Sequence, residues 1–323
     1  MKITTLATFL TVAAVLALGQ AQQDFSKVEV HSIPAQGNVH MLIGAGGNIA
    51  AQVGRDGVLL VDTMYAPLAP KILAEVKKIN AGPLRYIIDT HVHADHIGGN
   101  EPLRKAGSTI AGGNVSGDLG AAAGEGAALI AHENTANRMS APTGKESPVP
   151  TGAWPTSTFF DDEKKLFFNG EGIEIIHMPK AHTDGDVVVF FRRSDVIATG
   201  DIFTTNSYPI VDLERGGTYQ GLLDAVNRIL DLVIPVYGQE GGTVIIPGHG
   251  RLCDAGDLLN FREMTTIIRD RLVDMIKKGM TLEQVKAARP TQDYDTLYGQ
   301  GGFLTTDQFV ETAYKSLSQT LKK

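Results

Sequence analysis

Apolar and polar positions along this chain follow the two periods that strands and helices require. The apolar segments 39–43 and 49–53 flank the glycine-rich run 44–48, and this arrangement predicts a β-hairpin. The segment 58–62 is apolar up to its last residue, which indicates a buried strand. Further short apolar runs predict strands at 84–89, 109–111, 165–168, 173–178, 187–191, 196–199 and 243–247.

Helical spacing separates these groups of strands. Apolar residues on one face predict a helix over 67–80, which Gly82 and Pro83 end. Other helices are expected to open at 98–100, to show weakly over 125–139, and to occupy 219–233, 255–278 and 282–288. Because strands followed by helices occur twice, the pattern predicts an α/β fold of two mixed sheets covered by helices, an αββα sandwich.

Residues 112–158 differ in composition from the rest of the chain. They are rich in Gly, Ala, Ser, Thr and Pro and contain the sole tryptophan, Trp154. Two interpretations stay open here. The segment is either a lid or substrate loop beside the site, or a surface insertion in which Trp154 is the packing anchor.

The composition is that of an ordinary globular protein. The chain has 323 residues, of which 43% are hydrophobic and 20% charged, enough to bury a large core. Lys2, the apolar run from Ile3 to Leu18 and the small residues near Ala21 predict a signal peptide over 1–21. We therefore expect an exported protein, periplasmic or secreted, with one domain over 22–323 that ends in a helical extension. The apolar run is short for a membrane span, so no stable span is expected after cleavage.

The charge of the chain bears on its binding partners, and its cysteine content bears on disulfide bonds. The net charge is −7 and there is no basic run beyond short pairs such as Lys77 and Lys78, which gives no reason to expect nucleic acid. The only cysteine, Cys253, excludes an intrachain disulfide and is typical of a buried apolar filler.

The segment 90–96 carries the strongest chemical signal. Three histidines and an aspartate fall within six residues, directly after the strand expected at 84–89; they are His91, His93, Asp95 and His96. Imidazole and carboxylate groups at this spacing are typical of transition-metal ligands around an open position.

Three later residues repeat the same setting at strand ends. His182, Asp201 and His249 each follow an apolar run and lie near glycine, where the backbone can turn sharply and present a ligand. The chain has nine histidines, and four lack this setting and are interpreted as structural or surface residues: His31, His40, His132 and His177.

With these motifs the sequence resembles the metallo-β-lactamase superfamily of hydrolases over nearly the whole mature chain. The resemblance implies that His91, His93 and His182 hold one metal ion. It implies that Asp95, His96 and His249 hold a second ion and that Asp201 bridges both. Two zinc ions are expected, while iron or manganese also suits the oxygen and nitrogen donors.

The expected reaction is hydrolysis of a small-molecule ester, thioester, lactone or β-lactam. A hydroxide shared by the two ions would attack the carbonyl, and Asp95 would orient it and take up its proton. Asp62 and Asp184 are candidates for orienting the ligand imidazoles, although each also suits a plain strand-end or turn carboxylate.

The residue at position 201 distinguishes subgroups of this superfamily. Zinc β-lactamases of the cysteine type carry cysteine there and a substrate-binding lysine three residues later, whereas this chain has Asp201 and Thr204. A β-lactamase proper and a mononuclear iron enzyme similar to persulfide dioxygenases remain alternatives, as does a binding protein without catalysis. Specificity is expected in the loops at 64–66, 112–158 and 204–218, where Arg215 is either a contact for a substrate carboxylate or a solvated side chain.

Overall fold

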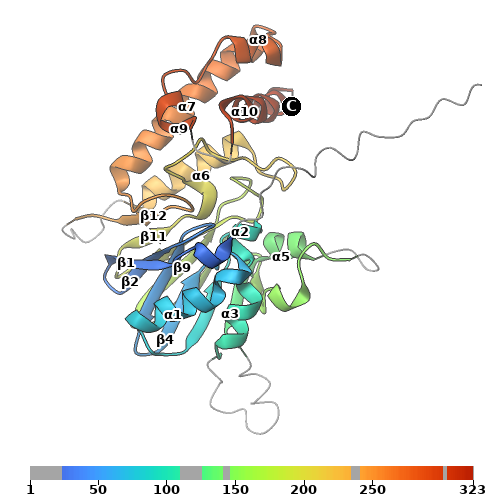
Figure 1. Ribbon diagram of the computed structural model, residues 1–323. Helices are drawn as coiled ribbons and strands as arrows, with labels where there is room; N and C mark the ends of the chain where they lie inside the picture. The colour runs from blue at the N-terminus through green and yellow to red at the C-terminus, as the bar shows by residue number, and fades with distance from the viewer. Residues whose placement is uncertain (1–23, 110–125, 141–145, 234–240, 301–303, 323) are drawn as a thin grey trace, which may run out of the picture.

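Two β-sheets face each other in the computed structural model, and helices cover their outer faces (Figure 1). The structure describes residues 24–109, 126–140, 146–233, 241–300 and 304–322. The expected signal peptide and most of the strand expected at 109–111 lie outside these residues. The αββα sandwich expected from the sequence is confirmed.

Within the described ranges, the first sheet has seven strands in sequence order. The strands are β1 (His31–Gln36), β2 (Val39–Ile43), β3 (Ile49–Gly54), β4 (Gly57–Val61), β5 (Leu84–Ile88), β6 (Ala128–His132) and β7 (Ser157–Phe159). Strands β1 to β4 pair antiparallel, and β4 to β7 pair parallel. The ends of β4 and β5 therefore meet at one edge of the sheet.

The second sheet contributes its own strand ends to that edge. Its order is β12-β11-β10-β9-β8 in the described part of the chain. The strands are β8 (Glu163–Phe168), β9 (Glu171–His177), β10 (Val187–Phe191), β11 (Val196–Ala198) and β12 (Val244–Ile246). Only β11 and β12 pair parallel. Their carboxyl ends consequently point the same way, which brings the segments after residues 198 and 246 together.

Three apolar layers hold the sandwich together. Side chains such as Leu59, Ile88 and Val189 fill the space between the sheets. A second cluster lies under α1 (Ala69–Ile79) and α3 (Asn100–Ala106), and a third lies under the C-terminal helices. Alternate residues of one strand enter different layers, as Leu59 and Leu60 do, because successive side chains of a strand point to opposite faces.

The remaining helices lie between these strands or follow them. They are α2 (Ala94–Ile97), α5 (Glu133–Met139), α6 (Tyr219–Leu232), α7 (Ala255–Lys277), α8 (Leu282–Ala287), α9 (Asp295–Tyr298) and α10 (Thr306–Leu321). Capping boxes at Asp254, Thr281 and Thr305 fix the starts of α7, α8 and α10. In Figure 1 these C-terminal helices gather beside α6, beyond the second sheet.

Some sequence predictions need correction. The weak helical pattern over 125–139 is wrong in its first half, where β6 forms a buried parallel strand between β5 and β7, and right for α5. Strand β1 was not expected, because its residues show no clear alternation. The helix expected over 67–80 begins with a 3-10 turn, Ala66–Leu68, before α1.

The segment 112–158 is in part a component of the fold. It contains β6, α5 and β7, while its residues 112–125 and 141–145 lie outside the described chain. Trp154 packs with Val92, Ile97 and Met139, so it anchors this segment against the predicted metal loop.

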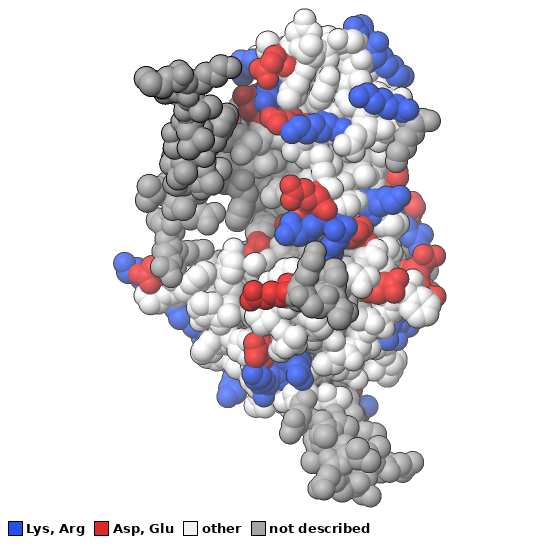
Figure 2. Space-filling view, turned by 90° about the vertical axis from the view of Figure 1, so that its right-hand side faces the viewer, with Lys and Arg blue, Asp and Glu red and all other residues white. Residues whose placement is uncertain are grey.

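Neither the described helices nor the face shown in Figure 2 has an unusual hydrophobic or charged character. Among the described residues, no helix is both long and apolar enough to cross a membrane. On the face shown in Figure 2, basic and acidic side chains are interspersed.

Candidate metal centre

The predicted ligands come from four loops, each at a strand end on the same edge of the sandwich. The loop after β5 carries His91 and its neighbours, and the connection between β9 and β10 carries His182. Asp201 follows β11 and His249 follows β12. The structure thus brings together all seven residues that the sequence singled out, in two adjoining groups.

The first group consists of His91, His93, His182 and Asp201. One ligand atom from each lies within 4.8 Å of the others. His182 Nε2 is 2.8 Å from His93 Nδ1, and Asp201 Oδ2 is 4.0 Å from His91 Nε2. Three imidazole nitrogens and one carboxylate oxygen thereby surround one point.

The second group consists of Asp95, His96 and His249, with a facing oxygen of Asp201. His249 Nε2 lies 3.3 Å from Asp95 Oδ2 and 3.4 Å from His96 Nε2. Asp95 is the more open member, since 17% of its side chain is exposed while that of His96 is fully buried. Access to this group is therefore from the side of Asp95.

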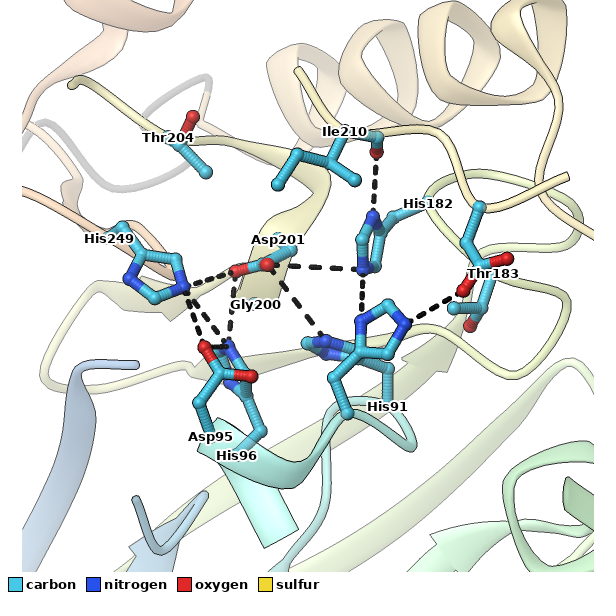
Figure 3. A network of polar contacts seen from close by, with 12 residues as sticks. His91, Asp95, His96, His182, Thr183, Gly200, Asp201, Thr204, Ile210 and His249 are labelled. Atoms are coloured by element: carbon cyan, nitrogen blue, oxygen red, sulfur yellow. Dashed lines mark hydrogen bonds and ion pairs between the residues drawn. The ribbon is translucent and has the colours of Figure 1, made fainter. Parts of the chain in front are cut away.

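Asp201 lies between the two groups (Figure 3). Its Oδ2 is 3.9 Å from His182 Nε2 in the first group. Its Oδ1 is 3.2 Å from His96 Nε2 and 3.4 Å from His249 Nε2 in the second. A carboxylate with one oxygen turned to each group has the arrangement that bridging two cations requires.

The buried polar atoms at the centre fit a metal ion. Among the described residues, His91 Nε2 is buried without a hydrogen-bond partner, and Asp201 Oδ1 is buried with only imidazole nitrogens of predicted ligands beside it. Leaving such atoms unsatisfied is costly, and a cation would satisfy both. The nitrogen and oxygen donors match zinc, with iron or manganese as further candidates.

Hydrogen bonds behind the ligands set which nitrogen faces the centre. His182 Nδ1 donates to the carbonyl of Ile210 at 2.6 Å, so Nε2 keeps its lone pair for the site. Burial lowers the pKa of His182 to about 4 and holds the pKa of His91 well below its usual range. Both imidazoles are consequently neutral near pH 7, as metal ligands must be.

Asp62 supports two ligands at once. Its Oδ2 accepts from His96 Nδ1 at 2.7 Å and from the Thr90 hydroxyl at 2.8 Å. That hydroxyl oxygen lies 3.0 Å from His91 Nδ1, so the contact reaches a second imidazole. Asp62 therefore contacts one predicted ligand directly and a second one through Thr90.

Asp184 does not take the orienting position that was the other expectation. Its carboxylate forms an ion pair with Arg138 at 2.7 Å, and its backbone carbonyl accepts from His177. The turn directs the side chain of Asp184 toward α5, away from the ligand imidazoles.

Asp212, which the sequence did not single out, is the carboxylate that lies behind the His93 imidazole. His93 Nε2 donates to Asp212 Oδ2 at 2.8 Å, which turns His93 Nδ1 toward the centre. Arg215 donates to the same oxygen at 2.7 Å, so Arg215 is bound to Asp212. Burial alone would raise the pKa of Asp212, but the hydrogen bonds from His93 and Arg215 hold it well below its usual range.

Two glycines allow the loops to close on the ligands. A Cβ at Gly47 would lie 2.2 Å from the His96 ring, and a Cβ at Gly248 would lie 2.1 Å from Asp201 Oδ1. Neither distance is possible for a real side chain, so glycine is required where these backbones approach the site.

The chain matches a known protein family and shares sequence with known proteins. The family model described as the metallo-beta-lactamase superfamily matches residues 43–249, which include every predicted ligand. A linear primary-alkylsulfatase of Pseudomonas sp. (strain ATCC 19151) is 24% identical over 258 residues, covering 71% of this chain and 47% of that protein. A type 2 metallo-beta-lactamase of Bacillus cereus is 24% identical over 206 residues, covering 63% of this chain and 67% of that protein.

A solved structure shows the same fold. The sec-alkylsulfatase Pisa1 from Pseudomonas sp. superimposes with a TM-score of 0.59 at 16% identity. The superposition covers 90% of this chain and 50% of that one. The chain thus spans about half the length of the two alkylsulfatases that it matches.

Proposed function

Because the chain belongs to the metallo-beta-lactamase superfamily of hydrolases, we propose that its two ligand groups hold two zinc ions and that it hydrolyses an ester, thioester, lactone or β-lactam. The observation that carries the proposal is the position of Asp201. Its two oxygens face the two groups separately, at 3.9 Å from His182 and 3.2 Å from His96.

The chemistry follows from the donors and the exposure of the site. When bound, two such ions lower the pKa of water to near neutrality and polarise the oxygen of a carbonyl group. Asp95, which lies at the open side, accepts the proton of the attacking water at its carboxylate. Asp62 and Asp212 hold His96 and His93 in the orientation that binding requires.

A sulfate ester is the second candidate substrate. The alignment with the linear primary-alkylsulfatase covers 71% of this chain, against 63% for the B. cereus lactamase. The superposition with the sec-alkylsulfatase covers 90%, so it extends beyond the residues 43–249 that the family model matches. This wider coverage favours adding alkyl sulfates to the substrates tested.

A β-lactamase proper is less well supported by the residues at the site. Asp201 stands where the cysteine-type enzymes have cysteine, and Thr204 stands where they have lysine. Thr204 is buried, with its hydroxyl directed to Ser207. It therefore offers no positive charge for the carboxylate of a β-lactam.

The test is metal content with a substrate panel on the same sample. Elemental mass spectrometry of the purified protein gives the metal per chain, and the panel contains nitrocefin, a small lactone, a thioester, an aryl ester and an alkyl sulfate. Two zinc ions with turnover of a carbonyl substrate support the proposal. Turnover of the sulfate alone selects the second candidate, and one iron without hydrolysis contradicts both and favours an oxygen-dependent redox enzyme.

We also propose that the protein is exported after cleavage near Ala21. The support is the composition of residues 1–21. Mass spectrometry of the protein recovered outside the cytoplasm tests this, because an intact residue 1 in that fraction would contradict cleavage.

A further inference from the structure

The N-terminal turn Phe25–Lys27 lies against the loop between β4 and α1, which contains Tyr65. It is a short 3-10 helix, capped by Asp24, whose carboxylate accepts from the backbone and hydroxyl of Ser26. The Phe25 ring packs on the Tyr65 ring with centroids 5.2 Å apart and planes inclined by 54°. The turn is drawn in blue near α2 in Figure 1.

Tyr65 in turn lies beside the open ligand, Asp95. A Cβ built on Gly46 would be 3.2 Å from Tyr65 Cε2, 3.3 Å from Asp95 Cβ and 2.8 Å from the Asp95 carbonyl oxygen. The ring edge and Asp95 therefore border the same turn of the β2–β3 hairpin. The amide of Gly47 donates to that Asp95 carbonyl at 3.0 Å, which fixes the hairpin to the metal loop.

The backbone of the Tyr65 loop is fixed on the side of α2. The Thr63 amide donates to the carbonyl of His96 at 2.7 Å, and the Gly99 amide donates to Met64 at 3.0 Å. These hydrogen bonds fix the main chain at residues 63 and 64, whereas Tyr65 itself is only half-buried and relies on its neighbours for its position. Phe25 supplies such a neighbour.

Lys71 attaches the N-terminal turn to the body of the protein. Its ammonium group donates to the carbonyls of Phe25 at 3.0 Å, Ser26 at 2.8 Å and Val28 at 2.5 Å. Lys71 belongs to α1, and Phe25 and Val28 pack against the apolar cluster under that helix. Three charge-assisted hydrogen bonds from one rigid helix make this segment a fixed part of the structure.

We propose that the N-terminal segment 25–28 is a positioning element of the active site, in which Phe25 holds the Tyr65 ring as the wall beside Asp95. The wall meets the part of the substrate that lies on the Asp95 side, and it favours a planar or apolar group there because the ring offers a flat apolar face. Phe25 and Lys71 are positioning residues, since they act through Tyr65. The effect on substrate rests on the proposed hydrolase function, whereas the positioning itself does not.

The experiment uses two independent ways of loosening the turn. Phe25→Ala removes the ring contact, and Lys71→Met removes the three donors while keeping an aliphatic stem. Phe25→Tyr is the conservative variant. The matched controls are Phe160→Ala, at a phenylalanine that is 74% exposed, and Lys77→Met, at an exposed lysine on the same helix α1.

The first measurement is hydrogen exchange of the full-length protein by mass spectrometry, which needs no substrate. Peptides that cover 62–66 and 44–48 should exchange faster in Phe25→Ala and Lys71→Met, with no change in a peptide from β10, because only the wall has lost support. Phe25→Tyr and both controls should match the wild type. Unchanged exchange in both loosened variants would overturn the proposal, as would an equal increase in the controls.

The second measurement separates binding from chemistry on whichever panel substrate is turned over. Phe25→Ala should raise KM about 2- to 10-fold with kcat nearly unchanged, the range expected for one aromatic contact. Restoration of KM in Phe25→Tyr supports the positioning role, and an unchanged KM in Phe25→Ala contradicts it. If no panel substrate is hydrolysed, the proposed function fails, while the exchange result still decides the positioning of Tyr65.

Discussion

Asp212 Oδ2 accepts a hydrogen bond of 2.8 Å from His93 Nε2, although the two residues are 119 positions apart in the chain. This contact orients the one ligand imidazole that is substantially exposed, with 23% of its side chain accessible. Because the neutral imidazole has a single N–H, its use by Asp212 leaves Nδ1 as the atom that faces the first ligand group.

The first prediction concerns this pair. Asp212→Asn keeps the size of the side chain but removes the carboxylate charge that accepts the hydrogen bond from His93 Nε2. We expect the affinity of the first group for zinc to fall about 10- to 100-fold, measured by competition with a chromophoric chelator. Asp224→Asn, at an exposed position of α6, is the control. An affinity equal to that of the control would show that Asp212 does not support the ligand.

The contrast between Asp212 and Asp184 shows which contacts of the site the sequence could predict and which it could not. The ligands were found because each follows an apolar strand, and strand ends meet at one edge of a sheet. Asp184, two residues from His182 in the sequence, was a candidate to orient an imidazole, with a plain turn carboxylate as the alternative. Its side chain instead pairs with Arg138, and the residue that does contact a ligand comes from a distant loop. Proximity in sequence does not set side-chain direction in a tight turn, so such contacts need the fold.

The strands also show how far the local sequence can predict structure. Strand β4 was expected from its continuous apolar run, and its residues are buried on both faces. Strand β6 also lies between two parallel neighbours, but five residues followed directly by α5 have no spacing that separates strand from helix. Its assignment depends on pairing with β5 and β7, which only the tertiary structure provides.

The second prediction concerns the bridging carboxylate. If each oxygen of Asp201 serves one group, Asp201→Ala should lower the zinc content from about two ions per chain toward one. Elemental mass spectrometry gives the stoichiometry, and far-ultraviolet circular dichroism reports whether the fold is kept. Two ions per chain in a folded variant would remove Asp201 from the bridging position.

The third prediction concerns the proton at the open side of the site. Asp95→Asn keeps one side-chain oxygen for the second group but cannot accept a proton near neutral pH. We expect kcat to fall by at least about 100-fold on the substrate identified by the panel, the range typical of removing a general base. Zinc content measured on the same sample is the control. Full activity with two ions bound would assign the proton to another group.

The fourth prediction is a pH dependence of stability that has its origin outside the metal centre. Glu75 on α1 is nearly buried and accepts from Lys78 and from the hydroxyl and amide of Ser32. The hydrogen bonds from Lys78 and then Ser32 lower the pKa of Glu75 to about 2 from its ordinary value of 4.5. Because the folded-state pKa is the lower one, the carboxylate stabilises the fold fully above pH 4.5, and this contribution is lost as the pH falls toward 2.

Glu75→Gln should therefore lower the free energy of unfolding by about 1.5–3 kcal/mol at pH 7, the range for hydrogen bonds to a charged group. The difference from the wild type should shrink as the pH falls from 5 toward 2.5, measured by urea denaturation at a series of pH values. Protonation of the metal ligands affects both proteins alike, so the difference isolates Glu75. Glu283→Gln, at an exposed position of α8, should show no such trend. A difference that stays constant with pH would mean that the carboxylate charge does not contribute to the stability of the fold.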